Sequence, residues 1–214
     1  YRRERQMCIR DRVELMYVDF AGVCFDQLMN QAAKMRYMFG GKQSVPMVVR
    51  TVVGAGFRAG SEHSQTLYSL YAHIPGLKVV APYDAFDAKG LLLSAIKDDD
   101  PVIFMEHKRL YMTKCDVPND LKPIPLGKGR IRKTGKDITI IAIQRMNLFA
   151  EEAAKILDDE KAKDAKSKAA KKNAPQNNAV KKAAPKKKVK KNAIAVAKKI
   201  NKKKAAVKKV GKKK

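Results

Sequence analysis

Short apolar runs alternate with helix-like segments between residues 13 and 107, and this alternation restricts the fold more than any other feature of the sequence. The runs VELMYVDF, SVPMVVRT, LKVVAP and PVIFMEH contain few polar residues, as strands buried on both faces do. Apolar residues recur in steps of three and four from residue 20 to residue 39, which predicts a helix that ends at Gly40 and Gly41. We therefore expect an α/β fold: a parallel sheet with helices on both faces.

Two further helices are predicted between the later strands. GSEHSQTLYSLYAHI begins with Ser61 as a candidate N-cap, and YDAFDAKGLLLSAIKDDD begins with Asp84 as N-cap and Asp87 three residues later. After a proline-rich connection, DITIIAI predicts a strand and LFAEEAAKILDDEKAK a helix. The expected organisation is a leader at 1–12, a first domain at 13–133, an incomplete second domain at 134–160 and a disordered tail at 161–214.

Charge is concentrated at the two ends of the chain. Residues 161–214 hold 23 lysines and one acid, or +22 of the net charge of +26, and the first twelve residues add +3. Residues 13–160 therefore carry only about +1. The lysine-rich tail contains hardly any aromatic residues, so it cannot bury enough apolar surface to offset the entropy of ordering.

Cysteine and apolar patterns exclude several classes of protein. Cys8, Cys24 and Cys115 are widely spaced, which predicts neither a zinc site nor a disulfide framework and favours a reducing compartment. No apolar run approaches the roughly 20 residues that span a bilayer, so we expect no membrane contact. The leader lacks the apolar centre of a signal peptide, and its segment RQMCIRDR resembles a translated sequencing adapter. We expect residues 1–12 to be foreign to the natural protein.

Ordered blocks across residues 13–157 resemble one enzyme family. VELMYVDFAGVCFDQLMNQAAKMRYMFGGK, GAGFRAGSEHSQTLY and HIPGLKVVAPYDAFDAKGLLLSAIKDDDPVIFMEHKRLY are similar to the beta subunit of the thiamine-diphosphate-dependent component of 2-oxo acid dehydrogenase complexes. The acetoin dehydrogenase branch is the nearest, through VDFAGVCFDQ and GGK. The resemblance implies a transketolase-like pyrimidine-binding domain in the bacterial cytoplasm or the mitochondrial matrix.

The same resemblance implies that this chain provides half of an active site. The family works as an alpha2beta2 heterotetramer whose alpha subunit supplies the diphosphate and Mg²⁺ site, and it passes acyl groups to a lipoyl-bearing acyltransferase. No GDG-type motif of the alpha subunit occurs here. The family's glutamate that contacts the cofactor pyrimidine is expected just before Tyr1. We expect the chain to be inactive alone.

Met16 and Phe20 are the residues that the resemblance places at the cofactor. Phe20 matches an aromatic ring that stacks on the pyrimidine, and Met16 lies beside it. Stacking suits a flat heteroaromatic ring and excludes water from its reacting edge. Periodicity alone favours the alternative, in which Phe20 is a core residue at the start of the following helix.

His63 matches the active-site histidine of the family's HS motif. At the start of a helix, the partial positive charge of the dipole would keep its imidazole neutral, and a neutral imidazole can both accept and donate a proton during acyl transfer. The alternative is a histidine that hydrogen-bonds a neighbouring loop, which is the role expected for His73 and His107.

SAIKDDD matches a potassium site of the family. The implied ligands are carbonyls at a helix end, a carbonyl on the strand VPMVV and two carboxylates: Ala95 and Ile96, Met47, and Asp98 and Asp100. The alternative is a solvated acidic turn.

The tail supports a second class of function. Lysine-rich segments at 161–214 could bind nucleic acid without sequence preference through contacts with phosphates. An unrelated sequence joined to a gene fragment would explain the same composition. Transketolases share the fold, but EHS and HIPGLKVV favour the dehydrogenase branch.

Overall fold

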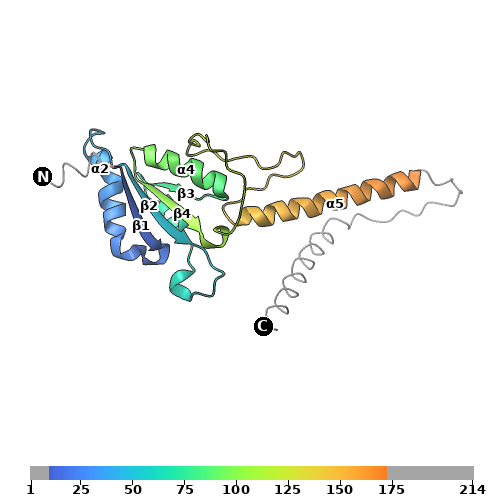
Figure 1. The fold of residues 1–214 in the computed structure, drawn as a ribbon, viewed down its shortest axis with the longest axis horizontal. Coiled ribbons are helices and arrows are strands. Elements are labelled where there is room, and N and C mark those ends of the chain that lie inside the picture. The colour runs from blue at the N-terminus through green and yellow to red at the C-terminus, as the bar shows by residue number, and fades with distance from the viewer. Residues whose placement is uncertain (1–9, 173–214) are drawn as a thin grey trace. The chain divides into compact units, whose positions relative to one another are not determined.

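Four parallel strands form one sheet within residues 10–172, the part of the chain that the computed structural model describes (Figure 1). The strands are β1 (Asp11–Tyr17), β2 (Met47–Val53), β3 (Lys78–Val80) and β4 (Val102–His107), in the order β1-β2-β4-β3. Every pairing is parallel, so the carboxyl ends of the strands meet at one edge of the sheet.

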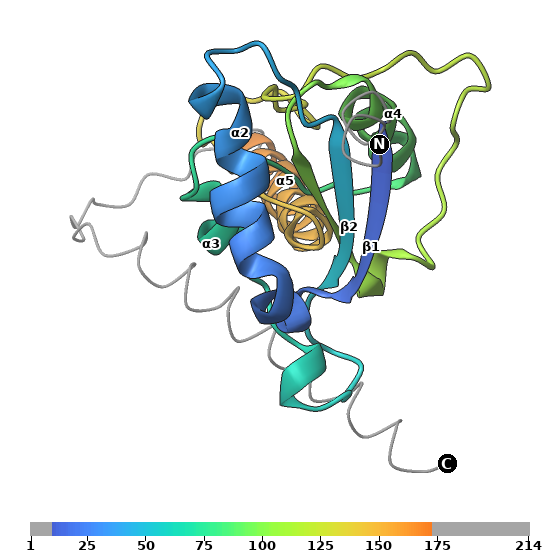
Figure 2. The same cartoon turned by 90° about the vertical axis from the view of Figure 1, so that its left-hand side faces the viewer.

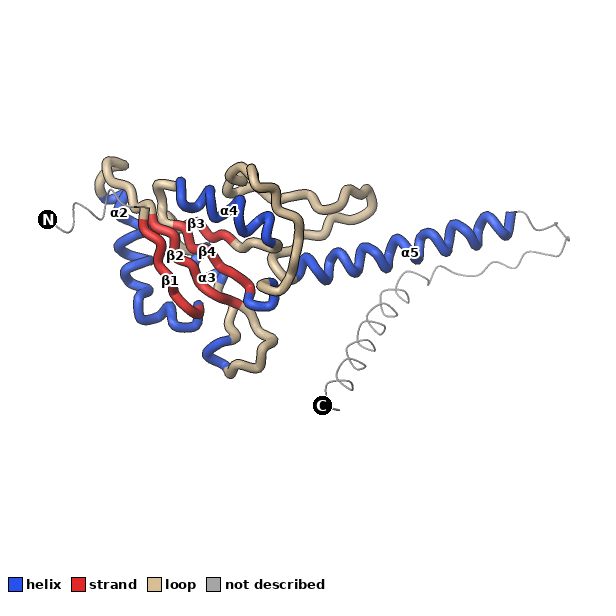
Figure 3. The backbone as a smooth tube through the Cα atoms, viewed as in Figure 1, coloured by secondary structure: helices blue, strands red, loops and turns tan. Residues whose placement is uncertain are grey.

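Helices connect the strands and cover both faces of the sheet, as Figures 1 and 2 show. One face is covered by a helical segment at residues 18–38 and by α3 (Tyr68–Ala72). The segment consists of η1 (Val18–Cys24), η2 (Gln27–Ala32) and α2 (Ala33–Met38). The opposite face carries α4 (Ala85–Lys97). The tube in Figure 3 makes the alternation of strands and helices visible.

Alternate strand residues contribute to two separate cores. Under the helical segment and α3 the buried residues are Val18, Ala21, Leu28, Val49, Val53, Tyr71, Ile103 and Met105. Under α4 they are Val48, Val80, Ala95, Val102 and Phe104. Because both sides of each central strand are buried, the strands appear in the sequence as nearly continuous apolar runs. The predicted fold class is confirmed.

The helix ends that were predicted from local sequence are also confirmed. Gly40 and Gly41 have φ of 61° and 79°, and the Gly41 N–H donates to the carbonyl of Arg36 at 2.8 Å, which closes the helix in the left-handed conformation that glycine favours. Asp84 caps α4, because its carboxylate accepts the Asp87 N–H at 2.8 Å.

The single helix predicted over GSEHSQTLYSLYAHI is wrong. The segment forms a three-residue turn, η3 (Ser61–His63), and then the short α3. Ser61 does not act as an N-cap, and Gly60 before it has φ of 85°. The N–H groups of Ser64 and Gln65 donate to the side chain of Asp19. A tertiary contact therefore takes the backbone groups that a continuous helix would have used.

The strand predicted over DITIIAI is also wrong. Residues 137–143 are irregular, and Ile138, Ile140, Ile141 and Ile143 are all exposed. A strand needs a neighbouring strand for its backbone hydrogen bonds, and none of the described residues pairs with this segment. The predicted helix forms as α5 (Met146–Lys172), which continues past residue 160, where the disordered tail was predicted to begin. The rest of the tail lies outside the described residues.

The start of β1 lies inside the predicted leader. Asp11 and Arg12 pair with Met47 and Val48 of β2, two residues before the predicted boundary. The chain divides into two units after Asp164, and the sheet and its helices belong to the first. Among the described residues, no helix is long and apolar enough to cross a membrane.

Candidate functional site

Three rings meet beyond the carboxyl end of β1. Tyr17 is the last residue of β1, Phe20 lies in η1, and His63 is the last residue of η3. The centroid of the His63 ring lies 4.5 Å from that of Tyr17 and 5.4 Å from that of Phe20, both edge to face. Parallel α/β sheets bind ligands at the carboxyl ends of their strands. The cluster therefore lies where a ligand site is expected.

Met16 and Phe20, the predicted cofactor residues, lie at the same edge. The pairing of β1 with β2 shifts register between Leu15 and Tyr17, so Met16 occupies a bulge and its side chain is 70% exposed. Phe20 is 44% exposed and belongs to neither buried core. The ring of Phe20 lies edge to face with the rings of His63 and Tyr17, at centroid distances of 5.4 and 6.4 Å. Phe20 is thus available to a ligand and is not a core residue of the helix.

His63 lies in the cluster, but its local structure differs from the prediction. It ends a three-residue turn, and α3 begins only at Tyr68, so the predicted effect of a helix dipole on its imidazole does not apply. Its Nδ1 is buried and has no hydrogen-bond partner among the described residues. A buried polar atom without a partner is costly, and such atoms are characteristic of sites that a ligand or water completes.

Two charged side chains that the sequence did not single out hold the backbone at His63. Lys108 is 5% exposed, donates from Nζ to the His63 carbonyl and lies 5.2 Å from the centroid of the Tyr17 ring. Asp19 Oδ1 accepts the Ser64 N–H at 3.2 Å and the Gln65 N–H at 3.0 Å. A lysine directly after the buried run PVIFMEH was the one available sign of this arrangement.

A second histidine lies at the same sheet edge. His107, the last residue of β4, packs against Gly54, and its Nδ1 accepts the Arg109 N–H at 3.2 Å. Burial lowers the pKa of His107, and the positive charge of Arg145 lowers it further. Arg109 itself donates to the Gly56 carbonyl at 3.1 Å. Arg109 and Arg145 therefore place positive charge beside His107.

The predicted potassium ligands lie at the opposite end of the sheet, where α4 ends and β4 begins. The carbonyls of Ile96 and Asp98 both accept from the guanidinium of Arg10, at 3.2 and 2.8 Å. The carbonyl of Ala95 accepts the Asp98 N–H at 3.3 Å. None of the described contacts of Arg10 reaches Met47. The carbonyl of Ile96, a predicted ligand, and the carbonyl of Asp98, whose carboxylate was the predicted ligand, thus point towards one positive group.

The carboxylates of this group are already paired. Asp98 accepts from Lys78 Nζ at 2.7 and 2.8 Å, and Asp100 accepts from Lys78 at 3.0 Å and from Arg36 at 2.7 Å. Burial alone would raise the pKa of Asp100, but the hydrogen bonds from Arg36 and Lys78 outweigh it and lower that pKa. Among the described residues, the predicted carboxylates therefore already have cationic partners.

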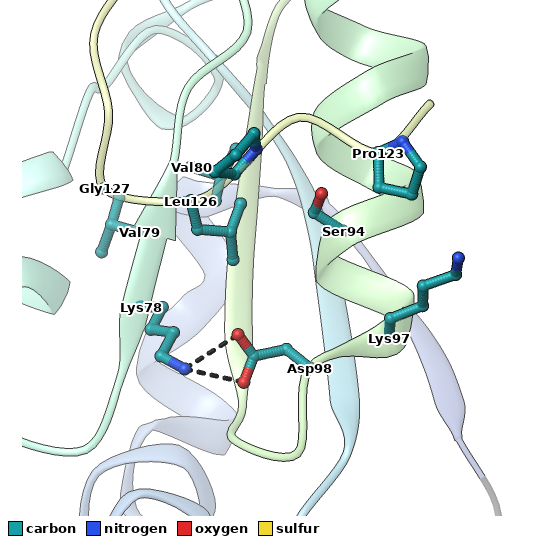
Figure 4. Close-up of a pocket in the computed structure, with 10 residues that line it drawn as sticks. Lys78, Val79, Val80, Ser94, Lys97, Asp98, Pro123, Leu126 and Gly127 are labelled. Atoms are coloured by element: carbon teal, nitrogen blue, oxygen red, sulfur yellow. Dashed lines mark hydrogen bonds and ion pairs between the residues drawn. The ribbon is translucent and has the colours of Figure 1, made fainter. Parts of the chain in front are cut away.

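Lys78 and Asp98 also line a cavity of about 690 Å³ between β3, α4 and residues 123–127 (Figure 4). Val80 and Leu126 provide apolar walls. Within the part of the chain that the structure describes, no three histidine, cysteine or acidic side chains come together as a metal site.

A parallel sheet covered on both faces, with a histidine and aromatic cluster at its carboxyl edge, defines a ligand-binding α/β domain. The chain belongs to the family "Transketolase, pyrimidine binding domain", whose model matches residues 8–114. Tyr17, Phe20, His63, Lys108 and Asp19 all lie within the match. Membership implies thiamine diphosphate as the cofactor, and the exposed ring of Phe20 beside the unpaired Nδ1 of His63 fits an aromatic heterocycle.

Known relatives match more than two thirds of this chain. The beta subunits of acetoin:2,6-dichlorophenolindophenol oxidoreductase from Cupriavidus necator and Bacillus subtilis are 55% and 54% identical over 71% and 69% of the chain. The beta subunit of the pyruvate dehydrogenase E1 component from Rickettsia felis is 45% identical over 71% of it. The chain spans 45%, 44% and 47% of these three proteins, less than half of each.

A solved structure supports the fold. The split gene transketolase, an inactive beta4 tetramer, matches with a TM-score of 0.55 and 25% identity, over 70% of this chain and 45% of that one. The resemblance that the sequence suggested is confirmed.

Proposed function

We propose that this chain supplies the pyrimidine-binding side of a thiamine-diphosphate site for the oxidative cleavage of acetoin or a 2-oxo acid, with transfer of the acyl group to lipoamide. The proposal rests mainly on the cluster of Tyr17, Phe20 and His63 at the carboxyl edge of the sheet. Identity is higher to the acetoin oxidoreductase subunits than to the pyruvate dehydrogenase subunit, so acetoin is the first substrate to test.

Phe20 and Met16 bind the cofactor in this proposal. The ring of Phe20 stacks on the aminopyrimidine, and Met16, raised by the bulge in β1, covers its edge. Thiamine diphosphate, when bound, supplies the carbon nucleophile of the reaction. The two side chains orient the heterocycle and exclude water from it.

His63 is the proton-transfer residue. An imidazole in its neutral form can accept a proton at one nitrogen and donate from the other, as acyl transfer to a dithiol-bearing carrier requires. The buried Nδ1 supports this role, because no described residue satisfies its hydrogen-bonding capacity and a bound group would have to do so.

Partners complete the site. An alpha subunit supplies the Mg²⁺ and diphosphate contacts within an alpha2beta2 assembly, and a lipoyl-bearing acyltransferase receives the product, in the bacterial cytoplasm or the mitochondrial matrix.

Potassium is the proposed second ion, bound by the carbonyls of Ala95, Ile96 and Met47 and by the carboxylates of Asp98 and Asp100. The support is that the carbonyls of Ile96 and Asp98 both accept from the guanidinium of Arg10, so they point towards one positive group. Thermal unfolding in potassium chloride and in tetramethylammonium chloride tests this. We expect a higher Tm in potassium chloride, and a larger difference between the two salts for Arg10→Gln, which removes the guanidinium from the carbonyls. Equal Tm values in both salts would contradict the proposal.

Nucleic-acid binding, the other function predicted from sequence, is not proposed. It rests on residues 161–214, most of which lie outside the described part of the chain, and the relatives do not support it.

The main test uses the chain assembled with the alpha subunit of an acetoin or pyruvate dehydrogenase. Aromatic contacts contribute about 0.5–1.5 kcal/mol, so Phe20→Ala should weaken thiamine diphosphate binding roughly three- to tenfold. Tyr37→Ala, which removes an exposed ring on α2, is the control. His63→Asn should lower kcat about 100-fold without changing cofactor affinity, and His73→Asn should change neither. An unchanged Kd for Phe20→Ala would overturn the proposal.

A further inference from the structure

One peptide group beside the ring cluster is held at both of its polar ends. The group joins His63 to Ser64: its carbonyl accepts a hydrogen bond from Lys108 Nζ, and its N–H donates to Asp19 Oδ1 at 3.2 Å. Asp19 also accepts the next N–H, that of Gln65, at 3.0 Å. Hydrogen bonds to charged groups are about twice as strong as neutral ones.

The two charged residues come from different parts of the sheet edge. Asp19 lies in η1, directly after β1, and Lys108 begins the short helical turn η4 (Lys108–Leu110), directly after β4. In the sheet, β2 lies between β1 and β4. The peptide that Asp19 and Lys108 hold belongs to the connection that follows β2. The orientation of this peptide is therefore set from both sides of the strand that precedes it.

Lys108 occupies an unusual environment for a lysine. It is 5% exposed, and its ammonium forms no ion pair with a carboxylate among the described residues. Its contacts are the His63 carbonyl and the ring of Tyr17, which itself lies edge to face with His63. A buried charge without an opposite charge lowers the stability of the fold. We therefore expect Lys108 to serve in positioning the His63 carbonyl and not in stabilising the protein.

We propose that Asp19 and Lys108 are positioning residues that fix the His63–Ser64 peptide and thereby hold the His63 imidazole against Tyr17 and Phe20. Neither residue touches the substrate or the cofactor in this role. The catalytic consequence rests on the proposed function of His63, whereas the structural consequence does not.

The structural test is the imidazole ¹H–¹³C spectrum of the full chain, which contains three histidines. Histidine-to-asparagine variants assign the signals. Lys108→Met keeps the length of the side chain and removes its charge, and it should shift and broaden the His63 signal, which senses the ring currents of Tyr17 and Phe20, and leave that of His73 in place. The control is Lys89→Met, because Lys89 also donates to backbone carbonyls, those of Pro118 and Asn119, but on α4. It should move neither signal.

Asp19 provides a second pair of variants. Asp19→Ala should shift the His63 signal, and Asp19→Asn, which retains an acceptor oxygen, should restore most of its position. If Lys108→Met does not fold, the His63 signals of Lys108→Arg and of the two Asp19 variants still test whether these residues position His63. An unchanged His63 signal in a folded Lys108→Met or Asp19→Ala variant would overturn the proposal.

Kinetics separate this proposal from the proposed function. In the assembled enzyme Lys108→Met should lower kcat about tenfold or more with little change in KM, because a displaced catalytic group loses rate and not substrate affinity. A shifted His63 signal with unchanged kcat would leave the positioning role intact and remove His63 from the chemistry.

Discussion

The imidazole of His107 lies directly against the backbone of Gly54. A methyl group on Gly54 would lie 2.3 Å from His107 Nε2, and Gly54 has φ of 96°. The ends of β2 and β4 therefore approach each other beside the ring cluster as closely as they do because residue 54 has no side chain.

Gly54→Ala should lower the free energy of unfolding by about 3 kcal/mol, because strain at positive φ and the collision with His107 act together. Urea unfolding measures the change. Gly22→Ala is the matched control, since a methyl group there meets no atom within 4 Å. Equal stability of the two variants would contradict the close packing of His107 on Gly54.

Gly90→Ala should destabilise α4 although alanine normally favours a helix by about 1 kcal/mol. The added methyl group would lie 2.4 Å from the side chain of Ile124. Overpacking of this kind costs about 1–3 kcal/mol. In the Ile124→Ala background the same substitution should be neutral or stabilising. A double-mutant cycle of unfolding free energies checks this, and a stabilising effect in both backgrounds would exclude the contact.

Gln144 should anchor the irregular segment before α5. It is 1% exposed, donates to the Met105 carbonyl and accepts from the Tyr68 hydroxyl, whose pKa burial raises to about 12. Gln144→Ala removes the partner of the buried Met105 carbonyl and of the half-buried Tyr68 hydroxyl, which should cost about 1–3 kcal/mol. Chemical unfolding tests this against Gln27→Ala on an exposed helical position. A loss no greater than that of the control would refute the anchoring role.

Asp100 should make stability sensitive to acid. Its pKa is lower in the folded chain than the value of about 4 in the unfolded one, so its contribution is present above about pH 4 and is lost as pH falls through the folded value. Asp100→Asn should therefore be less stable than the parent at neutral pH and should lose less stability at about pH 3. Asp120→Asn, on an exposed loop, is the control. Parallel pH profiles for the parent and Asp100→Asn would contradict the ion pairing with Arg36 and Lys78.

Sequence reasoning was most accurate where structure depends on neighbours in the chain. The apolar runs predicted four parallel strands, and Gly40 and Asp84 marked helix ends that the structure confirms. Prediction from the sequence failed where groups distant in the chain determine the hydrogen bonds of the backbone. The helix predicted from Ser61 breaks because Asp19 binds the N–H groups of Ser64 and Gln65, and the strand at 137–143 lacks a partner among the described residues.

Some residues of the candidate site could be predicted from the sequence, and others could not. The resemblance to known enzymes singled out Met16, Phe20 and His63, and the structure brings Phe20 and His63 into ring contact. It could not single out Tyr17, Asp19 or Lys108, because a tyrosine, an aspartate and a lysine at strand ends carry no motif. Their roles depend on which strand ends lie next to each other.

The order of residues alone determined the α/β class, the helix ends and the family, because these follow from periodicity, capping and the succession of motifs. Only the tertiary structure decided how His63 is held. The side chains that bond the His63–Ser64 peptide are 45 residues away on either side, and they meet it because β1, β2 and β4 end at one edge of a parallel sheet. Contacts over that separation depend on the packing of the whole sheet, which no local pattern records.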